Sequence, residues 1–244
     1  MTEKRHIPGF VYKLMLLAAT IIWGFAFVVM KDAVDVLPPA QLIGVRFFLT
    51  GLLMAAVFHR SLKGALNGPC LKAGLVLAVV TFLAFWVQTV GLADTTPGKN
   101  AFLTATYCVI VPFLWWAVVK KRPDGYNILA AVVCITGMAL VSLSGGFSVG
   151  IGEALTMCCG LFYAVHIIFT SRAVENYGVG VLTTLQFATA AVLCWITAPI
   201  SAPFPESVPA SSWLSIAYLC IFCTGVCYFF QTIGQKYTSP QTSS

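Results

Sequence analysis

Long apolar runs dominate this chain. Eight segments are almost entirely apolar: 14–31, 40–58, 73–93, 101–119, 127–144, 151–170, 179–200 and 212–233. A helix needs about 20 mostly apolar residues to cross the hydrocarbon core of a membrane, and each segment is close to this length. We therefore predict an all-α integral membrane protein with eight transmembrane helices, joined by short connections.

The composition excludes the soluble classes of protein. Hydrophobic residues make up 59% of the 244 residues and charged residues 9%, whereas a typical soluble domain is about 25% charged. A chain this short cannot hide so many apolar residues in one water-soluble core. The composition therefore excludes a soluble enzyme, a nucleic-acid binder and a disordered protein, and it makes the lipid bilayer the expected partner.

The basic residues indicate how the chain is oriented. If the N-terminus is cytoplasmic, eleven of the 14 lysines and arginines fall on the inner side: Lys4, Arg5, Lys13, Arg60, Lys63, Lys72, Lys120, Lys121, Arg122, Arg172 and Lys236. Cytoplasmic loops carry an excess of Lys and Arg. We therefore expect a multi-pass protein of the cell membrane, with the N-terminus and residue 244 both cytoplasmic.

The sequence contains an internal repeat. An offset of 140 in the numbering places Trp23 on Tyr163 and Arg46 on Gln186, and an offset of 143 places the stretch 88–91 (QTVG) on 231–234 (QTIG). The repeat restarts after five helices, and since five is odd, the second copy enters the membrane from the opposite side. Inverted repeats of this kind are typical of secondary transporters. We assign residues 1–146 to the first copy and 147–244 to the second.

The second copy is incomplete. Ser244 corresponds to Ala101, so the fourth and fifth helices of the first copy have no counterpart. We predict that the natural protein continues for roughly 45–60 residues through two further helices, judging from the length of the first copy.

Several stretches together resemble the drug/metabolite transporter superfamily, in particular the EamA-like permeases. They are IIWGFAFVVMKDAV (21–34), PPAQLIGVRFFLTGLL (38–53), QTVGLADTTPGKNAFLTATYCVIVPFLWW (88–116), KKRPDGYNILAAVVCITGMAL (120–140) and ALTMCCGLFYAVHIIFTSRAV (154–174). The resemblance implies a carrier of ten helices built from two inverted five-helix repeats, of which this chain would hold eight. It also implies that an arginine in the second helix faces the pore.

Arg46 is the leading candidate for substrate binding, because a charged side chain within the hydrocarbon is costly and therefore a candidate functional residue. It follows Pro39 by about two helical turns, which places it roughly 10 Å deep at about 1.5 Å per residue. A fixed guanidinium could hold a carboxylate or phosphate. Alternatively, Arg46 could extend to the interface or pair with Asp32 or Glu153 to hold the bundle together.

The other candidates are polar or aromatic side chains inside the predicted helices: Trp23, Gln88, Asn100, Thr104, Tyr107, Tyr163, His166, Gln186 and Gln231. Aromatic walls with a few polar groups suit a small organic substrate, although amides can also serve only to join neighbouring helices. Glu153 and His166 are candidates for binding a coupling proton. A solvated carboxylate at a helix end and a hydrogen-bonded buried histidine are the alternatives.

Motifs of nucleotide hydrolysis and of metalloproteases are absent from the sequence, and its nine cysteines lack zinc-site spacing. We therefore expect no enzyme activity, no cofactor and no metal site. The prediction is a secondary transporter of a small-molecule substrate by alternating access, with efflux of metabolites, amino acids or drugs implied by the resemblance. The alternative is a non-transporting membrane scaffold or a lipid-processing protein. A homodimer is left open.

Overall fold

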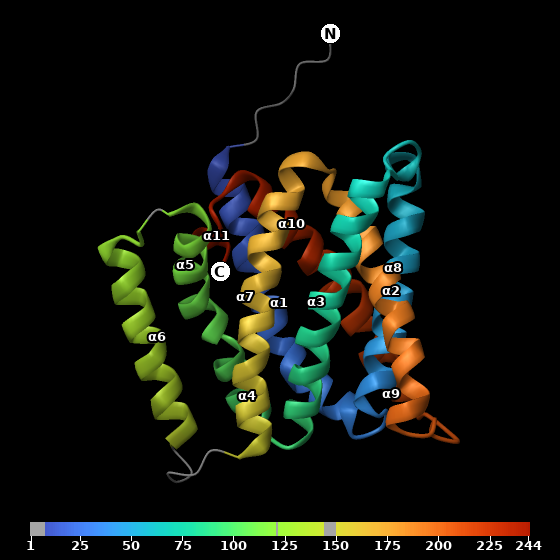
Figure 1. Ribbon diagram of the computed structural model, residues 1–244. Helices are drawn as coiled ribbons and strands as arrows, with labels where there is room; N and C mark the ends of the chain where they lie inside the picture. Colours follow the sequence, from blue (N-terminus) through green and yellow to red (C-terminus); the bar gives the residue numbers. More distant parts are fainter. Residues whose placement is uncertain (1–7, 121, 144–149) are drawn as a thin grey trace.

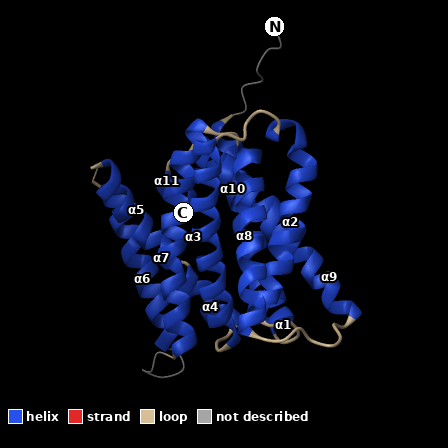
Figure 2. Ribbon diagram, turned by 45° about the vertical axis from the view of Figure 1, so that its right-hand side comes forward, coloured by secondary structure: helices blue, strands red, loops and turns tan. Residues whose placement is uncertain are grey.

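The computed structural model describes residues 8–120, 122–143 and 150–244, and there it is built of helices and loops with no strand (Figures 1 and 2). The elements are α1 (Gly9–Val34), α2 (Pro39–Leu62), α3 (Gly68–Ala93), α4 (Pro97–Thr104), α5 (Thr106–Val119), α6 (Gly125–Leu143), α7 (Ile151–Asn176), α8 (Val179–Ser201), α9 (Ala210–Tyr218), the π-helix η1 (Leu219–Val226), α10 (Cys227–Tyr237) and α11 (Pro240–Ser243).

The all-helical membrane fold is confirmed. Within the described ranges, seven segments are long and apolar enough to cross a membrane, with α4 and α5 forming one segment and α9, η1 and α10 another. The remaining predicted span is α6, whose apolar stretch Gly125–Val141 is shorter. The count of eight spans therefore stays a prediction, and the boundary at residues 146 and 147 lies outside the described residues.

Two helices, α3 and α4, begin before the predicted apolar runs and are capped by polar side chains. Asn67 Oδ1 accepts a hydrogen bond from the Cys70 amide at 2.9 Å, and α3 begins at Gly68 rather than at residue 73. Thr96 Oγ1 accepts from the Lys99 amide at 3.3 Å, and α4 begins at Pro97 rather than at residue 101. Such caps satisfy amides that have no partner within the helix. Hydropathy therefore marks the part of a helix that lies in lipid, and the caps mark its ends.

Two of the spans are interrupted in ways that hydropathy does not reveal. One breaks at Ala105, between α4 and α5. The other passes through η1, where side chains from two other helices bind backbone carbonyls: Thr50 Oγ1 donates to Cys220 O at 2.9 Å, and Trp23 Nε1 donates to Cys223 O at 2.8 Å. Short π-helical stretches often occur at functional sites. Here the π-helix is fixed by α1 and α2.

The helices form one bundle. Helix α2 packs along α8, α3 along α7 and α8, and α1 along α10, while α6 lies at the edge against α5 (Figure 1). A buried aromatic core joins α2, α3 and α8: Phe47 and Phe187 are fully buried with ring centroids 5.4 Å apart, and Phe85 lies 5.0 Å from Phe47. Large apolar side chains on the outer faces are exposed, as a lipid-embedded surface requires, including Leu52 on α2 and Leu140 on α6.

Glycines allow α3 and α7 to approach closely. A Cβ added to Gly91 would lie 2.6 Å from Thr156 Oγ1 and 2.7 Å from Gly152 O, and a Cβ on Gly152 would lie 2.8 Å from Gly91 O. Two of these three contacts are with backbone atoms, which cannot rotate away. Small residues at helix interfaces are typical of membrane bundles because they bring backbones together.

We expect Gly91→Ala to destabilise the bundle by about 1–3 kcal/mol, the usual cost of overpacking a close interface. Gly137→Ala on α6 is the matched control, since a Cβ there meets no atom within 4 Å. Thermal unfolding of the purified variants in detergent would test this. Equal midpoints for the two variants would show that the α3–α7 contact is not close-packed.

Candidate substrate cavity

A cavity of about 250 Å³ lies between α1, α2, α3, α4, α5, α7 and α10. Seven of the ten predicted substrate-binding residues line it, namely Trp23, Arg46, Gln88, Thr104, Tyr107, Tyr163 and Gln231. These residues come from all seven helices and from both halves of the chain. Residues from opposite ends of the sequence therefore surround one cavity.

Arg46 is the charged residue of this cavity and is only 3% exposed. Its Nη2 donates to Thr224 Oγ1 at 3.0 Å and its Nη1 to Met30 Sδ at 3.2 Å, while Cζ lies 5.1 Å from the ring centroid of Phe85. Among the described residues, no carboxylate lies within 4.0 Å of its guanidinium. Arg46 therefore does not form the alternative ion pair with Asp32 or Glu153, and it does not extend to an interface.

Gln88 is the centre of a buried hydrogen-bond network. Its Nε2 donates to Thr104 Oγ1 at 3.0 Å, and its Oε1 accepts from Tyr163 OH at 2.8 Å. Asn100 Nδ2 donates to the Gln88 carbonyl at 3.3 Å and to Thr156 Oγ1 at 2.7 Å. The network joins α3, α4 and α7. It thus brings together four of the residues that the sequence singles out and fixes the amide of Gln88.

Gln231 differs from Gln88, because its amide has no hydrogen-bond partner in the part of the chain that the structure describes. It lies where the cavity meets a second one of about 330 Å³, which also shares Thr20, Trp23 and Tyr107 with the first. The second cavity extends to Lys13 near the start of α1 and is also lined by Thr242, Ser243 and Ser244, the last three residues of this chain. The two cavities together therefore lead toward the end of the bundle at which α1 begins.

The other three predicted residues lie outside the lining of the first cavity. Asn100 is fully buried behind Gln88. His166 and Gln186 are buried and hydrogen-bonded to each other, with 3.1 Å between His166 Nε2 and Gln186 Oε1. The His166 ring packs edge-on against the Tyr228 ring, with centroids 5.7 Å apart. These residues support the wall of the cavity rather than form it.

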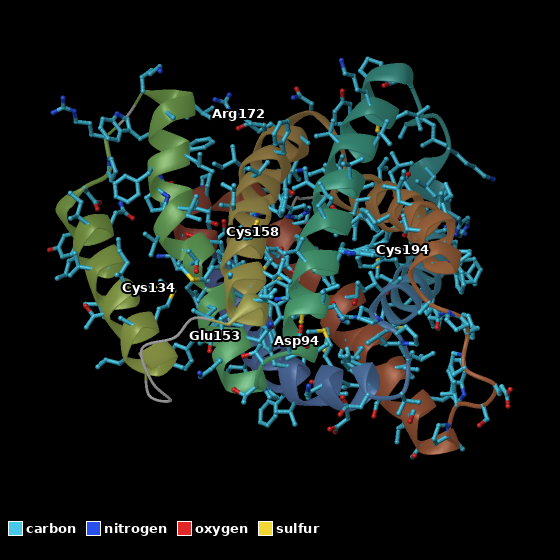
Figure 3. All side chains as sticks on the ribbon, turned by 60° about the horizontal axis from the view of Figure 1, so that its bottom comes forward. Asp94, Cys134, Glu153, Cys158, Arg172 and Cys194 are labelled. Carbon is cyan, nitrogen blue, oxygen red and sulfur yellow. The ribbon has the colours of Figure 1, made fainter. Side chains whose placement is uncertain are left out.

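Glu153 lies at the end of the bundle opposite the start of α1. It is near Asp94, and Arg172 lies at the other end of α7 (Figure 3). Glu153 Oε1 accepts from Lys99 Nζ at 2.6 Å, and its Oε2 accepts from the Gly150 amide at 3.3 Å. Neither Glu153 nor His166, the two candidates for a coupling proton, thus lines the first cavity. Across the described ranges, no three His, Cys, Asp or Glu side chains are placed to hold a metal ion together.

Sequence reasoning missed several residues of the wall. Phe85, Tyr228 and Met30 line the cavity, and Thr224 holds Arg46 from η1. A signal for two of them was present, since Phe85 and Tyr228 stand at an offset of 143, the same as Gln88 and Gln231. Thr224 carried no such signal, because its role depends on the π-helix.

Comparison with known proteins identifies relatives along nearly the whole chain. The model of the EamA-like transporter family matches residues 11–143 and 150–244. An uncharacterized transporter of Archaeoglobus fulgidus is 30% identical over 221 residues, which cover 91% of this chain and 66% of that protein. The uncharacterized inner membrane transporter YedA of Escherichia coli is 22% identical over 210 residues, which cover 85% of this chain and 68% of that protein. The chain thus spans about two thirds of the length of these relatives.

A solved crystal structure has the same fold. It superposes with a TM-score of 0.73 at 17% sequence identity and covers 95% of this chain and 81% of the other.

The two glutamines of the cavity should differ in their contribution to stability. Gln88→Leu removes the side-chain hydrogen bonds from Gln88 to Thr104 and from Tyr163 to Gln88. At roughly 0.6 kcal/mol for each hydrogen bond between membrane helices, it should lower the free energy of unfolding by about 1 kcal/mol. Gln231→Leu removes no hydrogen bond within the described chain and should change the free energy of unfolding by less than about 0.5 kcal/mol. Unfolding in detergent would test this, and similar losses in the two variants would argue against the network.

Proposed function

Because the chain belongs to the EamA-like transporter family, we propose that it is a secondary transporter of small organic solutes. It works by alternating access, in which two inverted repeats move about one central site. The substrates are metabolites, amino acids or drugs, and they leave the cell. The bundle is oriented with both ends of this chain in the cytoplasm.

The composition of the cavity wall carries this proposal. Six of its residues form three pairs of repeat mates: Trp23 with Tyr163 at an offset of 140, and Phe85 with Tyr228 and Gln88 with Gln231 at an offset of 143. Each copy thus contributes equivalent side chains to one site. A scaffold protein does not need a cavity built in this way, whereas a carrier that exposes one site to two sides does.

The packing of the helices supports the same proposal. Gly91 on α3 faces Thr156 on α7. Its repeat mate Gly234 on α10 faces α1, where an added Cβ would lie 2.6 Å from Leu16. Leu16 is in turn the mate of Thr156, at the offset of 140. The contact between α3 and α7 thus has an equivalent between α10 and α1, as expected for two copies that move against each other about a pseudo-two-fold axis.

The contacts at the end of the bundle opposite the start of α1 support a form that is closed at that end. There the Lys99–Glu153 ion pair joins α4 to α7. Lys31 joins α1 to the end of α3, because its Nζ donates to Leu92 O at 3.3 Å and to Ala93 O at 2.8 Å. The second cavity leads instead toward the end with most of the basic residues: Lys13, Arg60, Lys63, Lys72, Lys120, Arg122, Arg172 and Lys236. The excess of positive charge supports the assignment of this end to the cytoplasm. Lys4, Arg5 and Lys121 lie outside the described residues.

Release of solutes from proteoliposomes tests the function. Vesicles that contain the protein are loaded with a mixed extract of small metabolites, and the released compounds are identified by mass spectrometry against protein-free vesicles. Particular compounds should leave faster from vesicles with the protein, and Arg46→Ala should abolish or alter this release while the protein remains inserted. Equal release of every compound from both kinds of vesicle would contradict the proposal.

A further inference from the structure

We propose that the substrate is a small organic oxyanion, a carboxylate in the simplest case, whose charged group binds Arg46 and whose ring-sized apolar body fills the aromatic part of the cavity. The inference rests on the proposed transport function and names the substrate class of that same site.

The charges around the cavity favour an anion. Arg46 is the one fully charged side chain among the described residues that line the first cavity. The acidic residues of the described chain lie near helix ends or in loops: Asp32, Asp35, Asp94, Asp124, Glu153, Glu175 and Glu206. Charged groups inside a membrane protein usually pair with one another or with backbone carbonyls. Arg46 lacks such a counter-charge within the described chain, so a bound anion would neutralise it.

The guanidinium also has hydrogen-bonding capacity to spare. It carries five N–H donors, but among the described residues only Thr224 and Met30 accept from it. The thioether of Met30 is a weak acceptor, and the buried Nε has no partner there. A carboxylate or a related oxyanion offers several lone pairs at the spacing of the guanidinium fork. The unfilled donors therefore match an oxyanion better than a neutral or cationic group.

The opposite copy does not repeat this charge. The mate of Arg46 is Gln186, which is neutral, buried and hydrogen-bonded to His166. The rest of the wall is largely aromatic, with Trp23, Phe27 and Tyr163 beside the mate pair Phe85 and Tyr228. A cavity with one cationic point and aromatic walls can hold a ligand whose charge is at one end and whose body is apolar.

A second cationic side chain, that of Lys13, lies on the path to the cavity. Lys13 lines the second cavity, through which a solute from the N-terminal end would reach Gln231 and then Arg46. A cleft lined by one sign of charge raises the local concentration of ligands with the opposite sign. Lys13 thus adds one cationic side chain on the way to Arg46, which favours the approach of anions.

An isosteric series of three ligands separates charge from shape. Benzoate, benzamide and benzamidine have the same ring and a planar three-atom head, but their charges at neutral pH are −1, 0 and +1. Binding to the purified full chain in detergent is measured by calorimetry for the wild type, for Arg46→Gln and for the control Arg172→Gln. Arg172 is suitable as the control because it lies at the end of α7 over Trp115, away from the cavity.

Benzoate should bind wild type and Arg172→Gln about tenfold more tightly than benzamide, as one charge-assisted pair would produce, and more tightly still than benzamidine. In Arg46→Gln, benzoate should no longer bind more tightly than benzamide and benzamidine. Equal binding of the three ligands to wild type, an unchanged order in Arg46→Gln, or no binding of benzoate would each overturn the substrate class. The release of metabolites from proteoliposomes is independent of these ligands, so it separates failure of the substrate class from failure of the transport function.

Discussion

A positive charge held in the middle of a lipid-embedded bundle is the constraint on which the rest of this structure depends. Removing a guanidinium from water is expensive unless its surroundings replace the lost hydrogen bonds. Here Thr224, Met30 and the face of Phe85 do so only in part. Thr224 comes from the π-helical segment, and its hydroxyl also donates to Leu219 O at 2.8 Å, which leaves its oxygen directed at Arg46. The π-helix η1 therefore positions a hydrogen-bond acceptor for Arg46.

Close helix packing places the remaining walls. Glycines at the α3–α7 and α1–α10 contacts bring these helices together in pairs, and both pairs contribute residues to the wall of the cavity. The two glutamines, which are mates in the predicted repeat, have different surroundings: Gln88 is fixed by Thr104 and Tyr163, while Gln231 keeps a free amide within the described chain. Equivalent positions with unequal partners allow one site to present a fixed wall on one side and an adaptable group on the other.

Much of this arrangement could be predicted from the sequence, because in a membrane the hydropathy of a segment largely decides whether it spans. The apolar runs located the spans, and the cost of a buried charge identified Arg46. Trp23 and Tyr163, both of which the sequence singles out as candidates, line the same cavity. The break at Ala105 and the π-helix at Leu219–Val226 could not be predicted, since they arise from contacts between distant helices such as the bond from Trp23 to Cys223 O. Likewise, only the folded chain shows that Glu153 pairs with Lys99 and that His166 is held by Gln186.

The central claim is that one cavity around Arg46 carries an anion across the membrane as a carrier does, and counterflow tests it most directly. Proteoliposomes loaded with unlabelled benzoate are diluted into a trace of labelled benzoate. A carrier should accumulate the label inside transiently above its equilibrium level, and Arg46→Gln should lose this overshoot while Arg172→Gln keeps it. Simple equilibration of the label without an overshoot, or an overshoot that survives in Arg46→Gln, would contradict the account.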